Sequence, residues 1–337
     1  MTATGSRTDD AMVRQQLELR VCRVSDDRAG HLAQTAGLAA ALGTLTPVLE
    51  TQVRRGHAAT ALAGWLIGSS LPADGPSIAV GNAALRGTAD LILCCGHATH
   101  LTGLALRRAV GGRLVVLMRP SLPNCLFDLV VAPRHDGLSE SGRVLLTDGV
   151  LNPLTTTGLH DPRRGLMLLG GPSRHHGWDE GAVLEQVRTL AAASPGVAWA
   201  LTTSRRTPAS TLQVLTSLSL PNLAVTPLGS TPPGWVAQQL ADCATVWITE
   251  DSVSMVYEAL TAGVAVGLLQ VPVRRDSRVV RGMRALAAAG RVTPFAAWQG
   301  GEPLARGEPL AEADRVAKEI LRRWFPDRLG ADGVTPR

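Results

Sequence analysis

Short apolar runs alternate with polar loops and with apolar residues at helical spacing along most of the chain. The run from Leu17 to Val24 ends in the polar loop Ser25–His31, after which apolar residues recur every three or four positions. The same pattern recurs over Ala89–Val110, with Gly96 at the turn. Two further strands are expected in this half, at Arg113–Met118 and Phe127–Ala132. Such alternation indicates a mostly parallel sheet with helices on both faces.

A second set of units follows a stretch without periodicity, Leu151–Arg164, which is typical of a linker. The strands expected after it are Leu166–Leu169, Val197–Thr202, Leu223–Leu228, Thr245–Thr249 and Val264–Leu269. The helices expected there are Glu180–Ala193, Pro208–Leu218, Pro233–Ala241, Val253–Ala262, Val279–Ala289 and Ala311–Phe325. We therefore predict an α/β fold with two tandem doubly wound, Rossmann-like domains facing a cleft.

The length of 337 residues suits two domains, each with its own core. The patterns above place the first domain at residues 1–150, a linker at 151–164, the second domain at 165–310, and a C-terminal helix and tail at 311–337.

The amino-acid composition argues against several classes of function. The formal charge of +5 is spread evenly over both halves, and only 3% of the residues are aromatic, which argues against a nucleic-acid partner. Lys318 is the only lysine, which argues against a Walker P-loop and against Schiff-base enzymes. A small anionic ligand remains compatible with this balance.

The cysteines and the apolar stretches indicate the cellular compartment of the protein. Five cysteines without a C-x-x-C pair suit a reducing compartment, and Met1–Asp10 has no apolar signal region. The uncharged stretch His57–Ala73 is broken by glycine, serine and proline, so it falls short of a membrane-spanning helix. We expect a cytoplasmic protein with at most peripheral contact to the inner membrane face.

Three loops of the second half share small or hydroxyl residues followed by a helix start, which is a typical anion-binding arrangement. The expected anion-binding residues are Gly170, Gly171, Ser173, Ser204, Arg205, Arg206, Thr207, Asp251, Ser252, Ser254 and Met255. The arginines would add bidentate contacts to a phosphate or diphosphate. Glu258 lies about two helical turns beyond Asp251 and suits ribose hydroxyls. The alternatives are that the hydroxyl residues cap helices and that Glu258 is a solvated helix residue.

Two polar clusters follow strands of the first half. Asp27, Gly30 and His31 come after the first strand, where the glycine permits close approach of a ligand and His31 suits a general base. Arg134-His135-Asp136 follows a later strand and reads either as a second site cluster or as a surface turn. A structural role for His31 is the alternative.

Other active-site motifs are missing from the sequence. Cys94, Cys95, His97 and His100 lie close together, but adjacent residues at a strand end point to opposite faces, so we expect no metal site. The G-x-S-x-G elbow and the G-x-G-x-x-G fingerprint are missing, which weakens hydrolase and nicotinamide assignments.

Several stretches together resemble the bacterial and plant family named after a plant mitochondrial-fission (elongated mitochondria) protein, which is thought to have a GT-B glycosyltransferase-like fold. The matching stretches are Ser25–Gln34, Ala89–Gly96, Phe127–Asp136, Leu169–Ser173, Thr203–Pro208 and Thr249–Leu260. The combination of TSRRTP with EDSVSMVYEA is the most specific part.

The resemblance implies a metal-independent glycosyltransferase that moves a sugar from a nucleotide-sugar co-substrate to a cell-envelope acceptor of the lipopolysaccharide or glycolipid type, without a bound cofactor. It implies that the second domain holds the donor, with Glu258 on its ribose. It further implies that the first domain holds the acceptor near Gly30, Gly96 and residues 134–136, with His31 and Asp27 as catalytic residues. Two alternatives stay open, a non-catalytic interaction protein of the same fold and a sugar-nucleotide epimerase.

Overall fold

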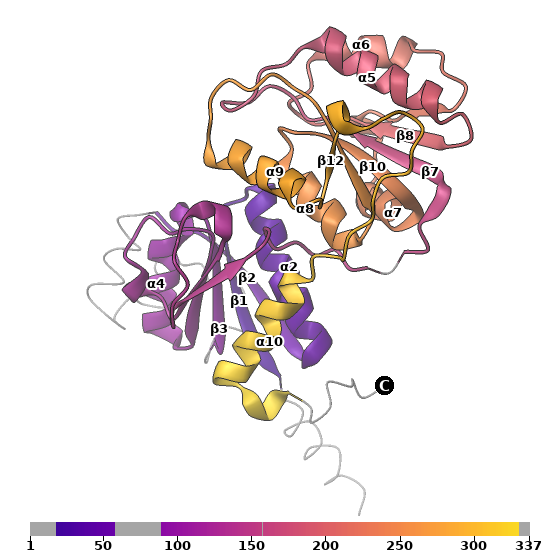
Figure 1. Ribbon diagram of the computed structural model, residues 1–337. Coiled ribbons are helices and arrows are strands. Elements are labelled where there is room, and N and C mark those ends of the chain that lie inside the picture. The colour runs from indigo at the N-terminus through magenta and orange to yellow at the C-terminus, as the bar shows by residue number, and fades with distance from the viewer. Residues whose placement is uncertain (1–17, 58–88, 157, 330–337) are drawn as a thin grey trace, which may run out of the picture. The chain divides into compact units, whose positions relative to one another are not determined.

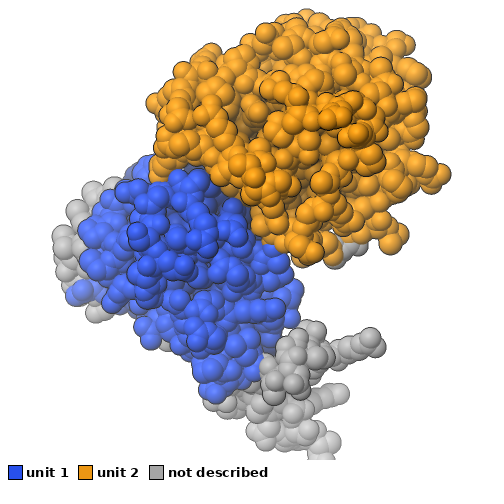
Figure 2. Space-filling view, viewed as in Figure 1, with its two compact units in different colours: residues 1–153, 311–337 blue, residues 154–310 orange. Residues whose placement is uncertain are grey.

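The computed structural model describes residues 18–57, 89–156 and 158–329 (Figure 1). Contacts divide the chain into two compact units (Figure 2): unit 1 contains residues 1–153 and 311–337, and unit 2 contains residues 154–310. Most of the stretch His57–Ala73 lies outside the described residues. Within the described ranges, no helix is both long and apolar enough to cross a bilayer.

Unit 1 is built on a six-stranded parallel sheet in the order β2-β1-β3-β4-β5-β6. Its strands are β1 (Leu19–Ser25), β2 (Val48–Arg54), β3 (Leu91–Cys95), β4 (Arg113–Leu117), β5 (Leu129–Pro133) and β6 (Val144–Thr147). Its α-helices in the described ranges are α2 (Ala29–Leu45), α4 (His100–Val110) and α10 (Glu312–Trp324). Short 3-10 turns occupy His97–Thr99, Asn124–Leu126, Arg134–Asp136 and Pro326–Arg328.

Helices cover both faces of this sheet. Leu38 and Leu42 of α2 pack with Ile320 and Leu321 of α10 against one face, and Figure 1 shows the two helices side by side. Leu104 of α4 belongs to the core on the opposite face. The helix expected at the C-terminal end of the chain therefore belongs to unit 1, although it follows unit 2 in sequence.

Unit 2 repeats the architecture with a parallel sheet in the order β12-β11-β10-β7-β8-β9. Its strands are β7 (Asp161–Leu168), β8 (Ala198–Thr202), β9 (Leu223–Val225), β10 (Cys243–Thr249), β11 (Ala265–Leu269) and β12 (Thr293–Pro294). Its α-helices in the described ranges are α5 (Glu180–Ala193), α6 (Ala209–Ser217), α7 (Trp235–Asp242), α8 (Val253–Ala262) and α9 (Arg278–Ala288). Two 3-10 turns lie at Leu228–Ser230 and Phe295–Ala297.

Strand β7 shows that the linker is shorter than expected. It begins at Asp161, inside the stretch 151–164, because its first residues pair with β10 while their side chains stay exposed and polar. Apolar patterning detects only the buried second half of this strand. The two parallel sheets with their helices otherwise confirm the predicted α/β class and the pair of Rossmann-like domains.

Candidate functional site

Each sheet has one place where the strand order reverses direction. In unit 1 this switch point lies between β1 and β3, and in unit 2 it lies between β7 and β10. Loops that leave neighbouring strands there diverge to opposite faces and open a crevice at the carboxyl ends. The residues predicted for binding or catalysis lie after the strands of these two points, after β5 and β8, and near the starts of α2 and α8.

His31 is the most strongly positioned side chain at the unit 1 switch point. Its Nδ1 lies 2.9 Å from the Oδ2 of Asp26, whose side chain is only 3% exposed, whereas that of His31 is 18% exposed. A buried carboxylate that accepts from Nδ1–H fixes the tautomer in which Nε2 carries the lone pair. The pair therefore presents a proton acceptor, and we call these two residues the Asp26–His31 pair.

Gly96 makes room for this imidazole. Its backbone has φ +83°, and a Cβ atom there would stand 2.3 Å from Cε1 of His31. A side chain at position 96 would thus be strained and would displace the ring. His31 and Gly96 therefore lie against one another, and an acceptor-side role for Gly96 stays a prediction.

Asp27 pairs with Arg54 and not with His31, and its catalytic role stays a prediction. Its backbone has φ +61°, and its exposed side chain forms an ion pair with Arg54. Hydrogen bonding from Arg54 lowers the pKa of Asp27. Gly30 and His31 also lie in the first turn of α2 rather than in a loop, and a Cβ atom at Gly30 would have no neighbour within 4 Å.

The cluster at residues 134–136 is largely engaged in the fold. The buried Asp136 accepts a hydrogen bond from the backbone N–H of Arg119 at 3.1 Å, and Arg119 in turn donates to its carbonyl. Arg134 is exposed and pairs with Asp148 at 2.8 Å. His135 is half-buried between them in the 3-10 turn after β5. An acceptor-side role for these three residues stays a prediction.

In unit 2 the three predicted loops converge, and we call their joined residues the loop cluster (Gly170, Gly171, Ser204, Arg206, Thr207, Asp251 and Ser252). The side chain of Asp251 is fully buried, and its Oδ2 pairs with Arg206 at 2.7 Å. The same oxygen accepts from the Gly171 N–H at 3.0 Å and from the Ser252 hydroxyl at 3.2 Å. Asp251 therefore ties the loop after β10 to those after β7 and β8.

Hydroxyl groups complete this connection. Ser204 and Thr207 donate to the carbonyl oxygen of Gly170, and the hydroxyl of Thr249 accepts from the Gly170 N–H at 2.7 Å. A Cβ atom at Gly171 would stand 2.1 Å from the carbonyl oxygen of Arg206, so the loops touch through their backbones. Neither α6 nor α8 has a side-chain cap, so the capping alternative for Ser204, Thr207 and Ser252 is wrong.

The cluster corrects part of the predicted anion site. The N–H groups of Gly170 and Gly171 already donate to Thr249 and Asp251, so they are not available to a phosphate. Arg206 is committed to Asp251 and also donates to the Gly171 carbonyl at 2.7 Å. Arg205, by contrast, is exposed and makes no hydrogen bond or ion pair with the described residues.

Helix α8 begins directly after the cluster. Its first turn contains the exposed Ser254 and the half-buried Met255, and described side chains do not cap its amides. Glu258 follows on the next turn, where burial raises the pKa of its carboxyl to about 7. An uncapped helix start suits an anion, and Arg205 lies on the loop after β8 that joins the same cluster. Anion binding by these residues stays a prediction.

A loop after β7 contributes one residue that sequence reasoning missed. Ser173 accepts from the backbone N–H groups of His175 and His176 instead of reaching the loop cluster. His176 is 1% exposed, and its Nδ1 has no hydrogen-bond partner among the described residues. Burial lowers the pKa of His176, so the ring is neutral near pH 7. The doublet His175-His176 is its only sequence signal.

The adjacent cysteines of β3 point to opposite faces, as expected for a strand. Cys95 belongs to the core under α2 and Cys94 to the core under α4, and burial raises the pKa of both thiols. They are core residues in this fold.

Comparison with known proteins identifies the family of the chain. The sequence model of the mitochondrial fission ELM1 family matches residues 29–324. The chain belongs to this family. No curated protein matches the sequence.

Solved structures that resemble this family member have the GT-B fold. One is the UDP-GlcNAc 2-epimerase of Methanocaldococcus jannaschii, with a TM-score of 0.52, 10% identity, and coverage of 91% of this chain and 100% of that one. Another is Phytolacca americana UGT2 complexed with UDP-2fluoro-glucose and pterostilbene, with a TM-score of 0.46, 11% identity, and coverage of 92% and 91%. The fold of this chain is accordingly GT-B-like.

Proposed function

We propose that this protein is a metal-independent glycosyltransferase that moves a sugar from a nucleotide-sugar donor to a hydroxyl of a cell-envelope glycolipid or saccharide. The observation that carries the proposal is the Asp26–His31 pair at the unit 1 switch point. A buried acid that orients a partly exposed imidazole is costly to build and suits a general base.

The reaction divides its tasks between the two units. Nε2 of His31 takes the proton of the acceptor hydroxyl, and that oxygen forms a bond to the anomeric carbon of the donor sugar. The bond between this carbon and the diphosphate breaks, and the nucleoside diphosphate leaves with the electron pair. Asp26 stabilises the imidazolium that forms.

Unit 2 supplies the groups that suit the leaving diphosphate. Arg205 is exposed without an internal partner, and the start of α8 offers uncapped amides, so both stabilise negative charge without a metal ion. In this proposal Glu258, on the second turn of α8, accepts hydrogen bonds from the ribose hydroxyls. The fold relatives titled as UDP-GlcNAc 2-epimerase and as a UDP-2fluoro-glucose complex are consistent with a nucleotide-sugar ligand.

The first test is calorimetric titration with UDP, GDP, ADP, CMP and their common sugar conjugates. We expect micromolar binding of one nucleotide series, weakened about tenfold or more by Arg205→Ala because a charge-assisted phosphate contact is lost. The control is Arg188→Ala, since Arg188 is a half-exposed arginine on α5 of the same unit that pairs with Glu185. Its affinity should equal that of the wild type.

The outcome also separates the alternatives. The absence of binding across the panel would favour the interaction protein of this fold. Donor consumption without any acceptor would favour an epimerase. Transfer to an acceptor that depends on His31 is the result that supports the proposal.

A further inference from the structure

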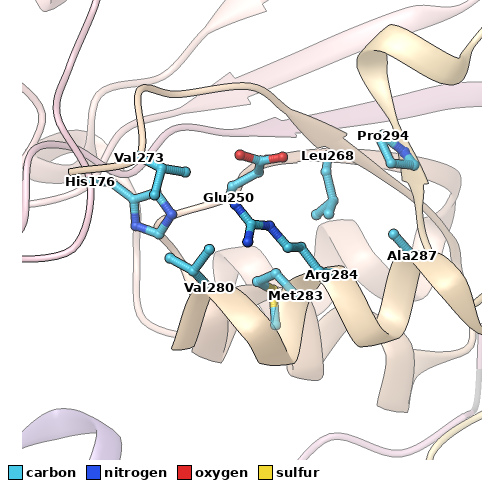
Figure 3. Close-up of a pocket in the computed structure, with 9 residues that line it drawn as sticks. All are labelled: His176, Glu250, Leu268, Val273, Val280, Met283, Arg284, Ala287 and Pro294. Carbon is cyan, nitrogen blue, oxygen red and sulfur yellow. The ribbon is translucent and has the colours of Figure 1, made fainter. Parts of the chain in front are cut away.

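Unit 2 contains a cavity of about 90 Å³ beside the loop cluster. It lies between the carboxyl ends of β10 and β11 and the helix α9, and Figure 3 shows the side chains that line it. At about 30 Å³ for each water molecule, this is room for about three water molecules, so the cavity suits a small substituent rather than a nucleobase.

Three polar side chains meet at this cavity. Glu250 follows β10 directly, Arg284 extends from α9 toward Glu250, and the imidazole of His176 lies at one end (Figure 3). Arg284 is 66% exposed and also pairs with Asp276 at 3.3 Å through Nη1, which leaves its other guanidinium N–H groups for a ligand. His176 is 1% exposed with an unpartnered Nδ1, so a polar atom that would normally be satisfied is left without a partner. Burial raises the pKa of Glu250 and lowers that of His176, which favours their neutral forms.

The remaining wall is apolar. Val280 and Met283 come from α9 and are 3% and 4% exposed, and Val273 closes the end beside His176 through a β-bridge. The cavity thus combines an acceptor, a donor and a surface for a methyl group within a space of few atoms. A neutral group with one N–H, one carbonyl oxygen and a methyl group satisfies all three.

We propose that this cavity binds the acetamido group of an N-acetylated sugar. The methyl group packs against Val280 and Met283, the N–H donates to Glu250, and the carbonyl oxygen accepts from Arg284. A plain hydroxyl at the same position could pair with Glu250 and Arg284 but would leave the apolar wall of Val280 and Met283 uncovered. The cavity therefore selects N-acetylhexosamine over hexose.

The position of the cavity fits this assignment, which rests on the proposed function. Glu250 precedes Asp251 of the loop cluster, and consecutive Cα atoms are about 3.8 Å apart. Asp251 and Arg206 both act electrostatically on His176. Glu250 of the cavity and Ser252 before the start of α8 are two residues apart, so their Cα atoms lie within about 8 Å of one another.

The test compares matched donors by calorimetry: UDP-glucose against UDP-N-acetylglucosamine, UDP-galactose against UDP-N-acetylgalactosamine, with UDP and GDP-mannose as references. We expect one N-acetylated donor to bind about tenfold or more tighter than its hexose partner. The variant Ala287→Leu fills the cavity and should abolish this preference while UDP alone binds as before. Ala285→Leu makes the same change at an exposed position of α9 and should keep the preference.

Glu250→Met is a second variant that removes the acceptor at similar length, so the answer does not depend on the folding of Ala287→Leu. It should also lose the preference and keep UDP binding. Equal affinity for hexose and N-acetylhexosamine donors overturns the acetamido assignment but leaves the glycosyltransferase proposal intact, as does exclusive binding of GDP-mannose. Failure of every nucleotide to bind overturns both.

Discussion

Both units place a buried aspartate beside a basic side chain at the switch point of their sheet, but the partners differ. In unit 1 Asp26 is 3% exposed and pairs with His31 at 2.9 Å. In unit 2 Asp251 is fully buried and pairs with Arg206 at 2.7 Å. The two geometries are nearly alike, and the chemistry of the partner decides what each pair can do.

Arginine is charged at every accessible pH and has only donors, so its pair with Asp251 is a permanent clamp between loops. Imidazole exchanges a proton near pH 7 and keeps a second nitrogen for a substrate. We therefore expect the Asp26–His31 pair to take part in proton transfer and the Arg206–Asp251 pair to stabilise the fold by linking its loops. The predictions below test this division.

The largest expected effect follows from His31→Gln. The glutamine amide still donates to Asp26, so the buried carboxylate keeps a partner and the free energy of unfolding should change by less than about 1 kcal/mol. The base is lost, so the transfer rate should fall about 10²- to 10⁴-fold. Rate measurements with a chemical denaturation curve check both. An unchanged rate would assign His31 a structural role and reject the proposed base.

Arg206→Ala, by contrast, should mainly lower the free energy of unfolding. It leaves the Asp251 carboxylate buried without its counter-charge, which costs about 3–5 kcal/mol of unfolding free energy. Asp251→Ala should cost less, about 2 kcal/mol, because the abandoned Arg206 is 41% exposed and can turn to water. Urea denaturation of both variants and of the double variant measures the asymmetry.

Arg205→Ala is the control for this clamp, since Arg205 is the exposed neighbour without an internal partner. Its unfolding free energy should match that of the wild type within about 0.5 kcal/mol. Equal destabilisation by the two arginine variants would contradict the clamp.

Much of the fold could be predicted from the sequence because the strands are buried and their ends are marked. The bounds of α5 and α8 agree with expectation, since Asp179 caps α5 and Gly263 ends α8 in a left-handed conformation. Strand β2 gave no comparable signal because most of its residues are exposed at the sheet edge. The start of β7 gave no signal either, because its first residues are exposed although the strand is central in its sheet.

The site could be predicted only to the level of its loops. The positions after β1, β7, β8 and β10 follow from the rule that ligands lie at carboxyl strand ends. The sequence pattern does not decide which residue faces the site in two doublets, Asp26-Asp27 and Arg205-Arg206. In the first, the left-handed backbone of Asp27 turns it to Arg54 and leaves Asp26 facing His31. Which member of a doublet faces inward depends on local φ and ψ, which a sequence of identical neighbours does not specify.

Glu258 provides a smaller effect than the loss of the Arg206–Asp251 pair, but one that separates stability from binding. Burial raises its pKa from 4.5 to about 7, so between these values the folded protein holds a proton that the unfolded chain releases. Stability therefore falls as the pH rises through this window and levels off above it. Glu258→Gln should be more stable than the wild type by about 1–3 kcal/mol at pH 8 and equal to it near pH 4.

Nucleotide affinity should show the reverse dependence, because the ionised carboxylate is the better acceptor for ribose hydroxyls. We expect wild-type affinity to rise from pH 6 to pH 8 and that of Glu258→Gln to stay flat over the same range. Denaturation and calorimetry in matched buffers give both curves. A residue that costs stability at the pH at which it strengthens binding is retained for its ligand rather than for the fold. Parallel curves for the two proteins would instead make Glu258 an ordinary half-buried acid of α8.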